Sequence, residues 1–264
     1  MSDCLLLALD VGNTNITLGA FDGPEMITHW RMATHRTMTA DELALTVRDL
    51  FALADLDAPS RCLKGTVAAS VVPTLDRAIR EWGDRYLDGR LLLVDRTVDL
   101  GITIRYIPPE AVGADRLVNA IAAYNEYGGP CIVVDFGTAT TFDVVADNGD
   151  YLGGAISPGI GISTEALFRN ASKLPRVDIV APTTAIGKTT SDSLTSGVVY
   201  GFASQVDGMV QRIRKELGTE AGVIATGGLA EVICKETETA RLVDPWLTLK
   251  GLALIWRRVK GAGS

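Results

Sequence analysis

The chain has 264 residues, of which 47% are apolar and 22% are charged, and its formal net charge at pH 7 is −7. This composition supplies ample material for a core and excludes a wholly disordered chain. An acidic chain without a basic stripe is a poor candidate for binding nucleic acid, because neutralising phosphates supplies much of that affinity.

The same survey argues against a membrane or secreted protein. No apolar run approaches the roughly 20 residues that span a bilayer, and the N-terminus lacks the basic region of a secretory signal. The four cysteines form no CxxC pair, and with only two histidines a zinc site of the usual ligands is not expected. We therefore expect a cytoplasmic protein.

Four short apolar runs predict buried strands, and each run ends in small or polar residues. In chain order they are Leu5 to Leu9, Thr66 to Val72, Cys131 to Val134 and Gly222 to Ala225. Continuous runs of this length suit central strands of a sheet that is covered on both faces. Polar residues at strand ends are typical of the ligand crevice of an open α/β sheet.

Helical patterns alternate with these strands. Thr39 and Glu42 form a capping box ahead of an apolar stripe, and Pro73 is placed to begin a second helix. Two further helices are predicted from Asp115 to Tyr127 and from Gly201 to Leu217. The alternation predicts an α/β fold.

Two glycine-rich segments follow in the second half of the chain. The segment from Gly153 to Gly159 is predicted to be a loop lining a cleft, since so many glycines disfavour a strand or helix interior. Thr226-Gly227-Gly228 is predicted to end a strand before a short helix, where its backbone could lie against an adenosine. Either segment could equally be a tight connection between elements.

Two loops share one pattern, about half the chain apart. Asp10-Val11-Gly12-Asn13-Thr14 and Asp135-Phe136-Gly137-Thr138 each follow a buried run and precede a second strand-like run. The spacing suggests two homologous halves, each opening with a β-hairpin, although two unrelated hairpin turns would give the same pattern by coincidence. We place the boundary at Gly128-Gly129-Pro130, which divides the chain into domains 1–128 and 129–264.

Both loops have the parts of a phosphate cradle. Gly12 allows backbone N–H groups to approach an anion closely, and Asp10 suits a Mg²⁺ ion held between a carboxylate and phosphates. The second loop repeats this logic with Asp135 and Thr138. Two such loops facing each other across a cleft would hold ATP, whereas an Asx-turn at a hairpin tip would need the same residues without a ligand.

A third motif, Gly113-Ala114-Asp115-Arg116, lies at a predicted helix start. There the helix dipole favours the charged carboxylate of Asp115, which could accept a proton from an alcohol that attacks phosphorus. Arg116 could pair with a substrate carboxylate in bidentate fashion. The alternative is a helix-start aspartate followed by a solvated arginine.

Taken in order, these motifs resemble those of the type III pantothenate kinases, which have the actin, sugar-kinase and Hsp70-like fold. The resemblance covers nearly the whole chain and implies an α/β fold of two homologous actin-like (ribonuclease H-like) domains with a nucleotide cleft between them. It rests on six motifs, namely Asp10 to Thr14, Ser70-Val71-Val72-Pro73, Gly113 to Arg116, Asp135 to Thr141, Gly153-Gly154 with Ser157-Pro158-Gly159, and Thr226-Gly227-Gly228.

The resemblance also implies an activity, ATP-dependent phosphorylation of pantothenate to 4'-phosphopantothenate, the first step of coenzyme A biosynthesis. Asp115 would be the general base, and Asp135 would bind a monovalent cation, K⁺ or NH₄⁺. Asp10 would lie near Mg²⁺, and Thr138 would contact the nucleotide. The remaining implied contacts are Tyr106, Gly113, Ala114, Asp115, Arg116 and Thr190 for pantothenate, and Asp10, Val11, Gly12, Asn13, Thr14, Asn15, Ile16 and Thr17 for ATP.

The family resemblance further implies a homodimer with pantothenate bound near the subunit interface. At position 189 many relatives carry Asn where this chain has Thr189, which leaves open whether Thr189 or Thr190 faces the substrate.

Two other functions compete with this interpretation. Another kinase or phosphohydrolase of the same fold could act on acetate, a sugar or polyphosphate, and the segment from Gly113 to Arg116 argues against it. A non-catalytic regulator could keep the fold without the chemistry. The acidic residues at positions 10, 115 and 135, all present, argue against that function.

Overall fold

The computed structural model describes residues 5–95, 97–171 and 174–261. The chain forms two compact units that interleave along the sequence. Unit 1 comprises the residues up to Gly101, then Glu110–Ala122, and the residues from Thr248 onward. Unit 2 comprises Ile102–Pro109 and Ala123–Leu247.

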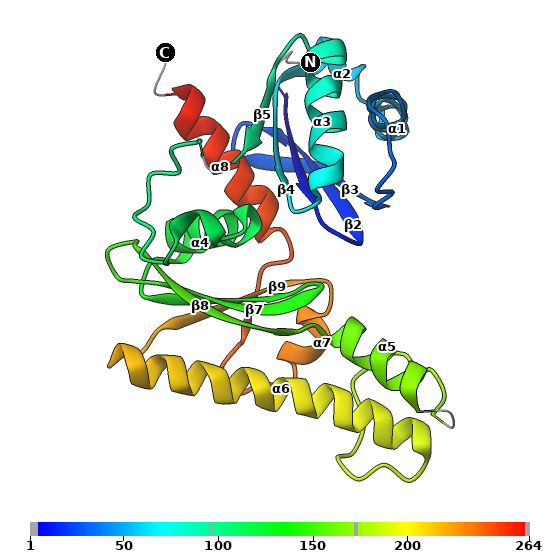
Figure 1. Cartoon of the computed structure of the whole chain (residues 1–264), viewed down its shortest axis with the longest axis vertical. Coiled ribbons are helices and arrows are strands. Elements are labelled where there is room, and N and C mark those ends of the chain that lie inside the picture. The colour runs from blue at the N-terminus through cyan, green and yellow to red at the C-terminus, as the bar shows by residue number, and fades with distance from the viewer. Residues whose placement is uncertain (1–4, 96, 172–173, 262–264) are drawn as a thin grey trace. The chain divides into compact units, whose positions relative to one another are not determined.

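Unit 1 is built on a five-stranded sheet with the order β3-β2-β1-β4-β5. Its helices are drawn in Figure 1, where α3 lies beside β4 and β5. The strands are β1 (Leu5–Val11), β2 (Asn15–Asp22), β3 (Glu25–Ala33), β4 (Leu63–Ser70) and β5 (Leu91–Val94). The helices are α1 (Ala40–Leu53), α2 (Pro59–Cys62), α3 (Pro73–Tyr86), the short 3₁₀ helix Pro109–Ala111, the first part of α4 (Ala114–Tyr127) and nearly all of α8 (Leu247–Gly261).

Unit 2 repeats this plan with the order β10-β9-β6-β7-β8. The long helix α6 runs beneath its sheet in Figure 1. The strands are β6 (Cys131–Phe136), β7 (Ala139–Val145), β8 (Tyr151–Pro158), β9 (Gly222–Gly227) and β10 (Leu242–Val243), and the helices are α5 (Ile160–Asn170), α6 (Thr190–Leu217) and α7 (Ala230–Cys234).

The two sheets have the same connectivity. In unit 1, β1 pairs antiparallel with β2 and parallel with β4. In unit 2, β6 pairs antiparallel with β7 and parallel with β9. In both units the hairpin continues to a third antiparallel strand, and the parallel side continues to one more parallel strand. The predicted α/β class with two repeated hairpin units is confirmed. The domain boundary between residues 128 and 129 stays a prediction.

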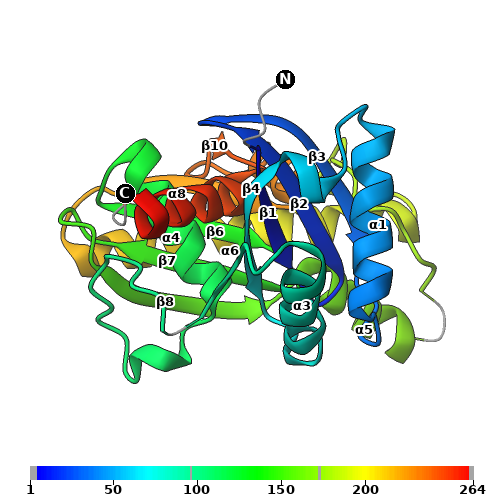
Figure 2. The same ribbon diagram turned by 90° about the horizontal axis from the view of Figure 1, so that it is seen from above.

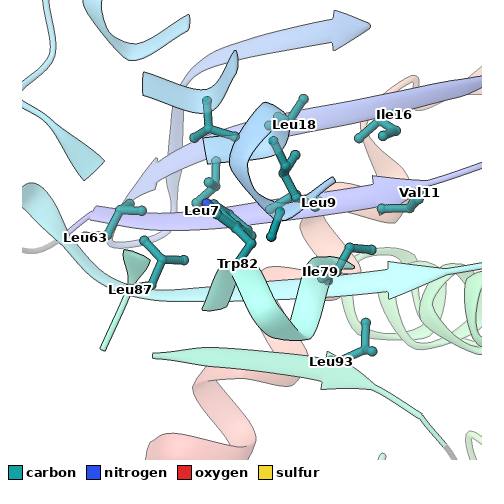
Figure 3. Packing of buried hydrophobic residues seen from close by; sticks show 14 of the residues in the cluster. Leu7, Leu9, Val11, Ile16, Leu18, Leu63, Ile79, Trp82, Leu87 and Leu93 are labelled. Carbon is teal, nitrogen blue, oxygen red and sulfur yellow. The ribbon is translucent and has the colours of Figure 1, made fainter. Parts of the chain in front are cut away.

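The central strands are buried on both faces. In unit 1 the residues Leu5, Leu7 and Leu9 belong to a core with α1 and α3, and Figure 3 shows Trp82 of α3 beside Leu7 and Leu9. Figure 2 shows α1 running along the side of the sheet formed by β2 and β3. A continuous apolar run suits such a position, because neither face of the strand meets water.

The opposite face of this sheet is covered by α8. A Cβ on Gly65 of β4 would lie 1.9 Å from the ring of Trp256, and one on Gly19 of β2 would lie 3.0 Å from Leu249. Both glycines therefore allow a helix to pack directly on the backbone of the sheet.

Unit 2 has a comparable core. Ile132, Val134 and Phe136 of β6 pack with Val199 and Val206 of α6. The other face of β6 carries Cys131, Val133 and Asp135, since side chains alternate along a strand. Asp135 thus lies on the face away from the α6 core.

One predicted element is wrong. The glycine-rich segment from Gly153 to Gly159 is predicted to be a loop, yet most of it forms β8, paired with β7 along its length. A Cβ on Gly154 would lie 1.7 Å from the carbonyl oxygen of Phe142, and Gly153 has a positive φ of 118°. The glycines serve a close, irregular strand pairing, and the pairing outweighs their low strand propensity.

Candidate active site

The first Asp-Gly loop is the tight turn between β1 and β2. Asp10 lies near the end of β1, opposite Thr17 of β2 and Ala69 of β4. The N–H of Gly12 donates to the carbonyl oxygen of Asn15 at 3.0 Å, which closes the turn. That N–H is therefore engaged within the loop, and Asn13 and Thr14 are the exposed residues at its tip.

Neighbouring segments of unit 1 hold this loop in place. The hydroxyl of Thr34 donates to the carbonyl oxygen of Gly12 at 2.7 Å, and Arg36 donates to the side-chain oxygen of Asn13 at 3.2 Å. On the other side, the N–H of Val71 donates to the carbonyl oxygen of Val11 at 3.0 Å. The Ser70–Pro73 motif therefore lies directly beside the first loop, as the end of β4 and the start of α3.

The predicted ATP residues differ in what they can offer. Val11 and Ile16 are buried in the core, so only their backbone atoms can face a ligand. Asn13 and Thr14 are exposed, while Asp10, Asn15 and Thr17 are half-buried. The polar side chains of the loop thus gather at its tip and on one side of β1 and β2.

The second Asp-Gly loop is the turn between β6 and β7. The N–H of Gly137 donates to the carbonyl oxygen of Ala139 at 3.1 Å, and the exposed Thr138 accepts at its carbonyl oxygen from the N–H of Gly159 at 3.2 Å. A Cβ on Gly227, at the end of β9, would lie 2.6 Å from Oδ1 of Asp135. Glycine is needed there because the Asp135 carboxylate lies directly against the β9 backbone.

Helix α5 begins at this same loop. Its N-cap is Gly159, which offers no side chain to the helix end, and a Cβ at that position would lie 2.3 Å from the carbonyl oxygen of Thr138. The turn of Thr138, the Asp135 carboxylate and the start of α5 are therefore adjacent. A helix N-terminus next to a glycine-rich turn suits an anion.

The donor atoms at the two loops suit a hard cation that also binds phosphate. Asp10 and Asp135 each offer carboxylate oxygens, and neither motif contains a sulfur or imidazole ligand. Within the described residues, no group of three or more His, Cys, Asp or Glu side chains is placed to hold a metal alone. Mg²⁺ bound by one or two carboxylates together with substrate phosphates needs no such group.

The predicted general base lies at the start of α4. Oδ1 of Asp115 accepts a hydrogen bond from the N–H of Arg116 at 2.8 Å. A Cβ on Gly113 would lie 2.5 Å from the same oxygen, so the carboxylate folds back over that glycine. Asp115 is half-buried and Arg116 is 8% exposed. The fully solvated arginine of the alternative interpretation is therefore not what the structure shows.

The remaining predicted substrate residues belong to unit 2. Tyr106 is half-buried and lies close to Gly153 of β8. Thr189 is the N-cap of α6, and its hydroxyl accepts from the N–H of Asp192 at 3.1 Å. Thr190 is the exposed first residue of the helix. The capping box thus engages Thr189 and leaves Thr190 as the better candidate for a substrate contact.

Some contacts in this region have no signature in the sequence. The approach of Gly227 to Asp135, the bond from Arg36 to Asn13, and an ion pair between Arg105 and Asp150 join residues far apart in the chain. Only the family motif at Thr226-Gly227-Gly228 hinted at the first of them. No helix of the described chain is both long enough and apolar enough to cross a membrane.

The fold and the paired Asp-Gly loops define the class of protein by its architecture, which is the actin and sugar-kinase fold. Solved structures with this fold superpose over nearly the whole chain. The activator of 2-hydroxyisocaproyl-CoA dehydratase from Clostridium difficile, with bound ADPNP, has a TM-score of 0.57 at 12% identity and covers 98% of this chain and 97% of its own. The ROK hexokinase from Thermus thermophilus has a TM-score of 0.54 at 16% identity, with 97% and 99% covered.

Sequence comparison narrows this class to one family. The profile of the type III pantothenate kinases matches residues 6–212. The type III pantothenate kinase of Moorella thermoacetica is 50% identical over 254 residues, which cover 96% of this chain and 99% of the relative. That of Brevibacillus brevis is 46% identical over the same shares of both chains. The chain belongs to the type III pantothenate kinase family.

Proposed function

We propose that this protein transfers the γ-phosphoryl group of ATP to the primary hydroxyl of pantothenate and forms 4'-phosphopantothenate, the first step of coenzyme A biosynthesis. The observation that carries the proposal is 50% identity to a type III pantothenate kinase over nearly the full length of both chains. The placement of Asp115 at a helix start and the two Asp-Gly turns at strand ends support it.

The residues of the chain divide into roles. Asp115 accepts the proton of the pantothenate hydroxyl, and Arg116 with Gly113 and Ala114 contacts the substrate. Tyr106 and Thr190 complete the pantothenate contacts. A nearby carboxylate of this kind contributes about 10²–10⁴-fold to rate in general-base catalysis. The support for Asp115 in this role is its half-buried carboxylate, which the Arg116 N–H orients.

The loop from Asp10 to Thr17 receives the phosphates of ATP, and Thr138 contacts the nucleotide. Asp10 lies on the Mg²⁺ side, and Asp135 binds a monovalent cation, K⁺ or NH₄⁺. When bound, these cations would neutralise phosphate charge. The support is the oxygen-only character of both loops and the contact of Asp135 with the β9 backbone.

The protein acts as a homodimer in the cytoplasm. Unit 2 exposes several large apolar side chains, which a second copy of the chain would cover. They are Ile156 on the edge strand β8, Ile162 and Leu167 on α5, and Val180 and Ile186 before α6. The buried cysteines of the described chain are free thiols, as is usual in a reducing compartment.

The deciding experiment is a coupled kinase assay with pantothenate, acetate, a hexose and polyphosphate as alternative acceptors, in potassium and in sodium-only buffer. Of the four acceptors, we expect only pantothenate to be phosphorylated, and only when potassium or ammonium is present. Turnover on another acceptor but not on pantothenate would replace this function with that of another kinase of the fold. Equal rates in sodium would remove the monovalent-cation role of Asp135.

A further inference from the structure

The segment that carries Tyr106 is paired with the beginning of β8. The N–H of Arg105 donates to the carbonyl oxygen of Tyr151 at 2.8 Å, and the N–H of Tyr151 donates to the carbonyl oxygen of Thr103 at 2.9 Å. The pairing is parallel and is centred on Ile104. Residues 103–105 therefore extend the sheet of unit 2 by one short edge segment, although the chain on either side of 102–109 belongs to unit 1.

An ion pair reinforces this short pairing. Nε and Nη2 of Arg105 both contact Oδ2 of Asp150, at 2.9 and 2.7 Å. The Asp150 side chain is only 13% exposed, whereas that of Arg105 is 61% exposed. The guanidinium of Arg105 holds the pKa of Asp150 below its ordinary value, and the side chains of Thr103 and Asn148 add to the effect. The carboxylate is thus a fixed, charged acceptor for the edge segment.

Tyr151 joins this attachment to the interior of unit 2. Its side chain is fully buried, and its hydroxyl donates to Oδ1 of Asp143 at 2.7 Å. The hydroxyl of Thr141 donates to the other oxygen of Asp143 at 2.9 Å. The residue that receives the edge segment therefore has no freedom to shift without breaking buried hydrogen bonds.

The ring of Tyr106 lies against Gly153 of β8. A Cβ on Gly153 would lie 3.3 Å from Cδ2 and 3.9 Å from Cε2 of Tyr106. Gly153 also has a φ of 118°, which residues other than glycine rarely adopt. At Gly153, β8 thus presents backbone without a side chain to Tyr106. Tyr106 is the residue directly after Arg105, whose side chain forms the ion pair.

We propose that Arg105 and Asp150 are positioning residues that hold Tyr106 in its substrate-binding place, so that they set the KM for pantothenate rather than the rate of phosphoryl transfer. The inference rests on the proposed function, because it takes Tyr106 as a pantothenate contact. Without the ion pair, the segment would lose its strongest side-chain attachment to unit 2, and the substrate would have to order it on binding. That cost falls on binding and leaves the chemical step unchanged.

The test compares Asp150→Asn and Arg105→Ala with the wild-type chain. Glu220→Gln is the matched control, because it neutralises the acid of another ion pair of unit 2, between Glu220 and Arg214 at 3.1 Å. Hydrogen exchange of the peptide that contains residues 103–106 reports the attachment without any substrate. Steady-state kinetics then give the KM values for pantothenate and ATP and the kcat.

We expect faster exchange of that peptide in both variants and a KM for pantothenate raised about 5- to 20-fold, which is at the lower end for losing a charge-assisted hydrogen bond because the Arg105 side chain is largely exposed. The KM for ATP and kcat should stay within about twofold of wild type. The exchanged pair Arg105→Asp with Asp150→Arg should recover part of both losses. In a Tyr106→Ala background, Asp150→Asn should raise the KM no further, because the positioned residue is already absent.

Each contrary result is decisive. Faster exchange with an unchanged KM, or a fall in kcat at constant KM, overturns the positioning role. Unchanged exchange shows that the ion pair does not hold the segment. A full additional KM effect in the Tyr106→Ala background shows that the pair acts through another residue. If the wild type and Glu220→Gln both fail to phosphorylate pantothenate, the proposed function fails, and the KM role of the pair falls with it, whereas the exchange result still stands.

Discussion

At the scale of single residues, Asp115 combines an oriented carboxylate with partial burial. Its Oδ1 accepts the N–H of Arg116 at 2.8 Å, and Gly113 leaves the space that the carboxylate occupies. The Cβ of any other residue at position 113 would lie 2.5 Å from Oδ1 of Asp115, so the carboxylate would have to move. The glycine and the aspartate of this motif are therefore coupled by geometry.

Asp115→Asn should lower kcat by at least about 10²-fold, since an amide cannot accept the proton of the attacking hydroxyl. The folded state and ATP affinity should be retained, as measured by circular dichroism and by calorimetric titration with an ATP analogue. Asp41→Asn, in the first turn of α1, is the matched control. Near-normal turnover of Asp115→Asn would remove Asp115 as the base.

The buried cysteines illustrate how burial alone alters chemistry. Burial raises the pKa of the Cys131 thiol to about 11, and it also raises the pKa of Cys234 to about 11, with a smaller contribution from Asp207. A thiol reacts with alkylating agents as the thiolate. Cys4 lies outside the described residues.

Native protein at pH 8 should therefore resist alkylation by iodoacetamide at Cys131 and Cys234, because almost none of either thiol is ionised there. The alkylation rate of both thiols should rise with pH and become appreciable only as the pH approaches their raised pKa. Peptide mass spectrometry measures the modified fraction, with guanidinium-unfolded protein as the fully reactive reference. Rapid native labelling of these two cysteines at pH 8 would contradict their burial.

At the scale of elements, two helix starts fall where the capping residues and proline predict them. Thr39 and Glu42 form the expected capping box, and α1 begins at Ala40; α3 begins at Pro73 as expected. By contrast α6 begins at Thr190, eleven residues before the predicted start. Its first turn, Thr190 to Ser193, is polar and exposed and carries no apolar side chain, so the Thr189–Asp192 capping box is its main signal in the sequence.

Thr189 and Thr190 should respond differently to truncation. Thr189→Ala removes the N-cap and should lower the free energy of unfolding by about 1 kcal/mol, with little effect on the KM for pantothenate. Thr190→Ala should leave stability nearly unchanged and raise that KM. Urea denaturation and steady-state kinetics on both variants measure the two effects. If the KM for pantothenate rises in Thr189→Ala and not in Thr190→Ala, Thr189 is the substrate residue.

At the scale of the whole molecule, the proposed assembly is a dimer of a 28.1 kDa chain. Analytical ultracentrifugation should give about twice that mass, because the exposed apolar side chains of unit 2 favour association. Ile162→Glu on α5 should shift the equilibrium toward monomer. Leu53→Glu, at a residue of unit 1 that is 81% exposed, is the matched control. A monomer at micromolar wild-type concentration would end the proposal.

The sequence by itself determined the α/β class, the four central strands, the repeated hairpins and the motif residues. These depend on local features, namely apolar runs, capping residues and Asp-Gly turns, which act over a few neighbouring positions. It could not reveal β8, because the strand owes its existence to pairing with β7 and its glycines argue locally for a loop.

Tertiary structure alone decided which distant residues meet. The backbone of Gly227 meets the carboxylate of Asp135, Thr189 is used as a cap, and the segment that carries Tyr106 is held by Asp150, 45 positions after its partner Arg105. Such contacts arise from strand register and close backbone approach, which depend on the packing of a whole unit. The physical reason is that pairing energy is non-local, so no short stretch of sequence records it.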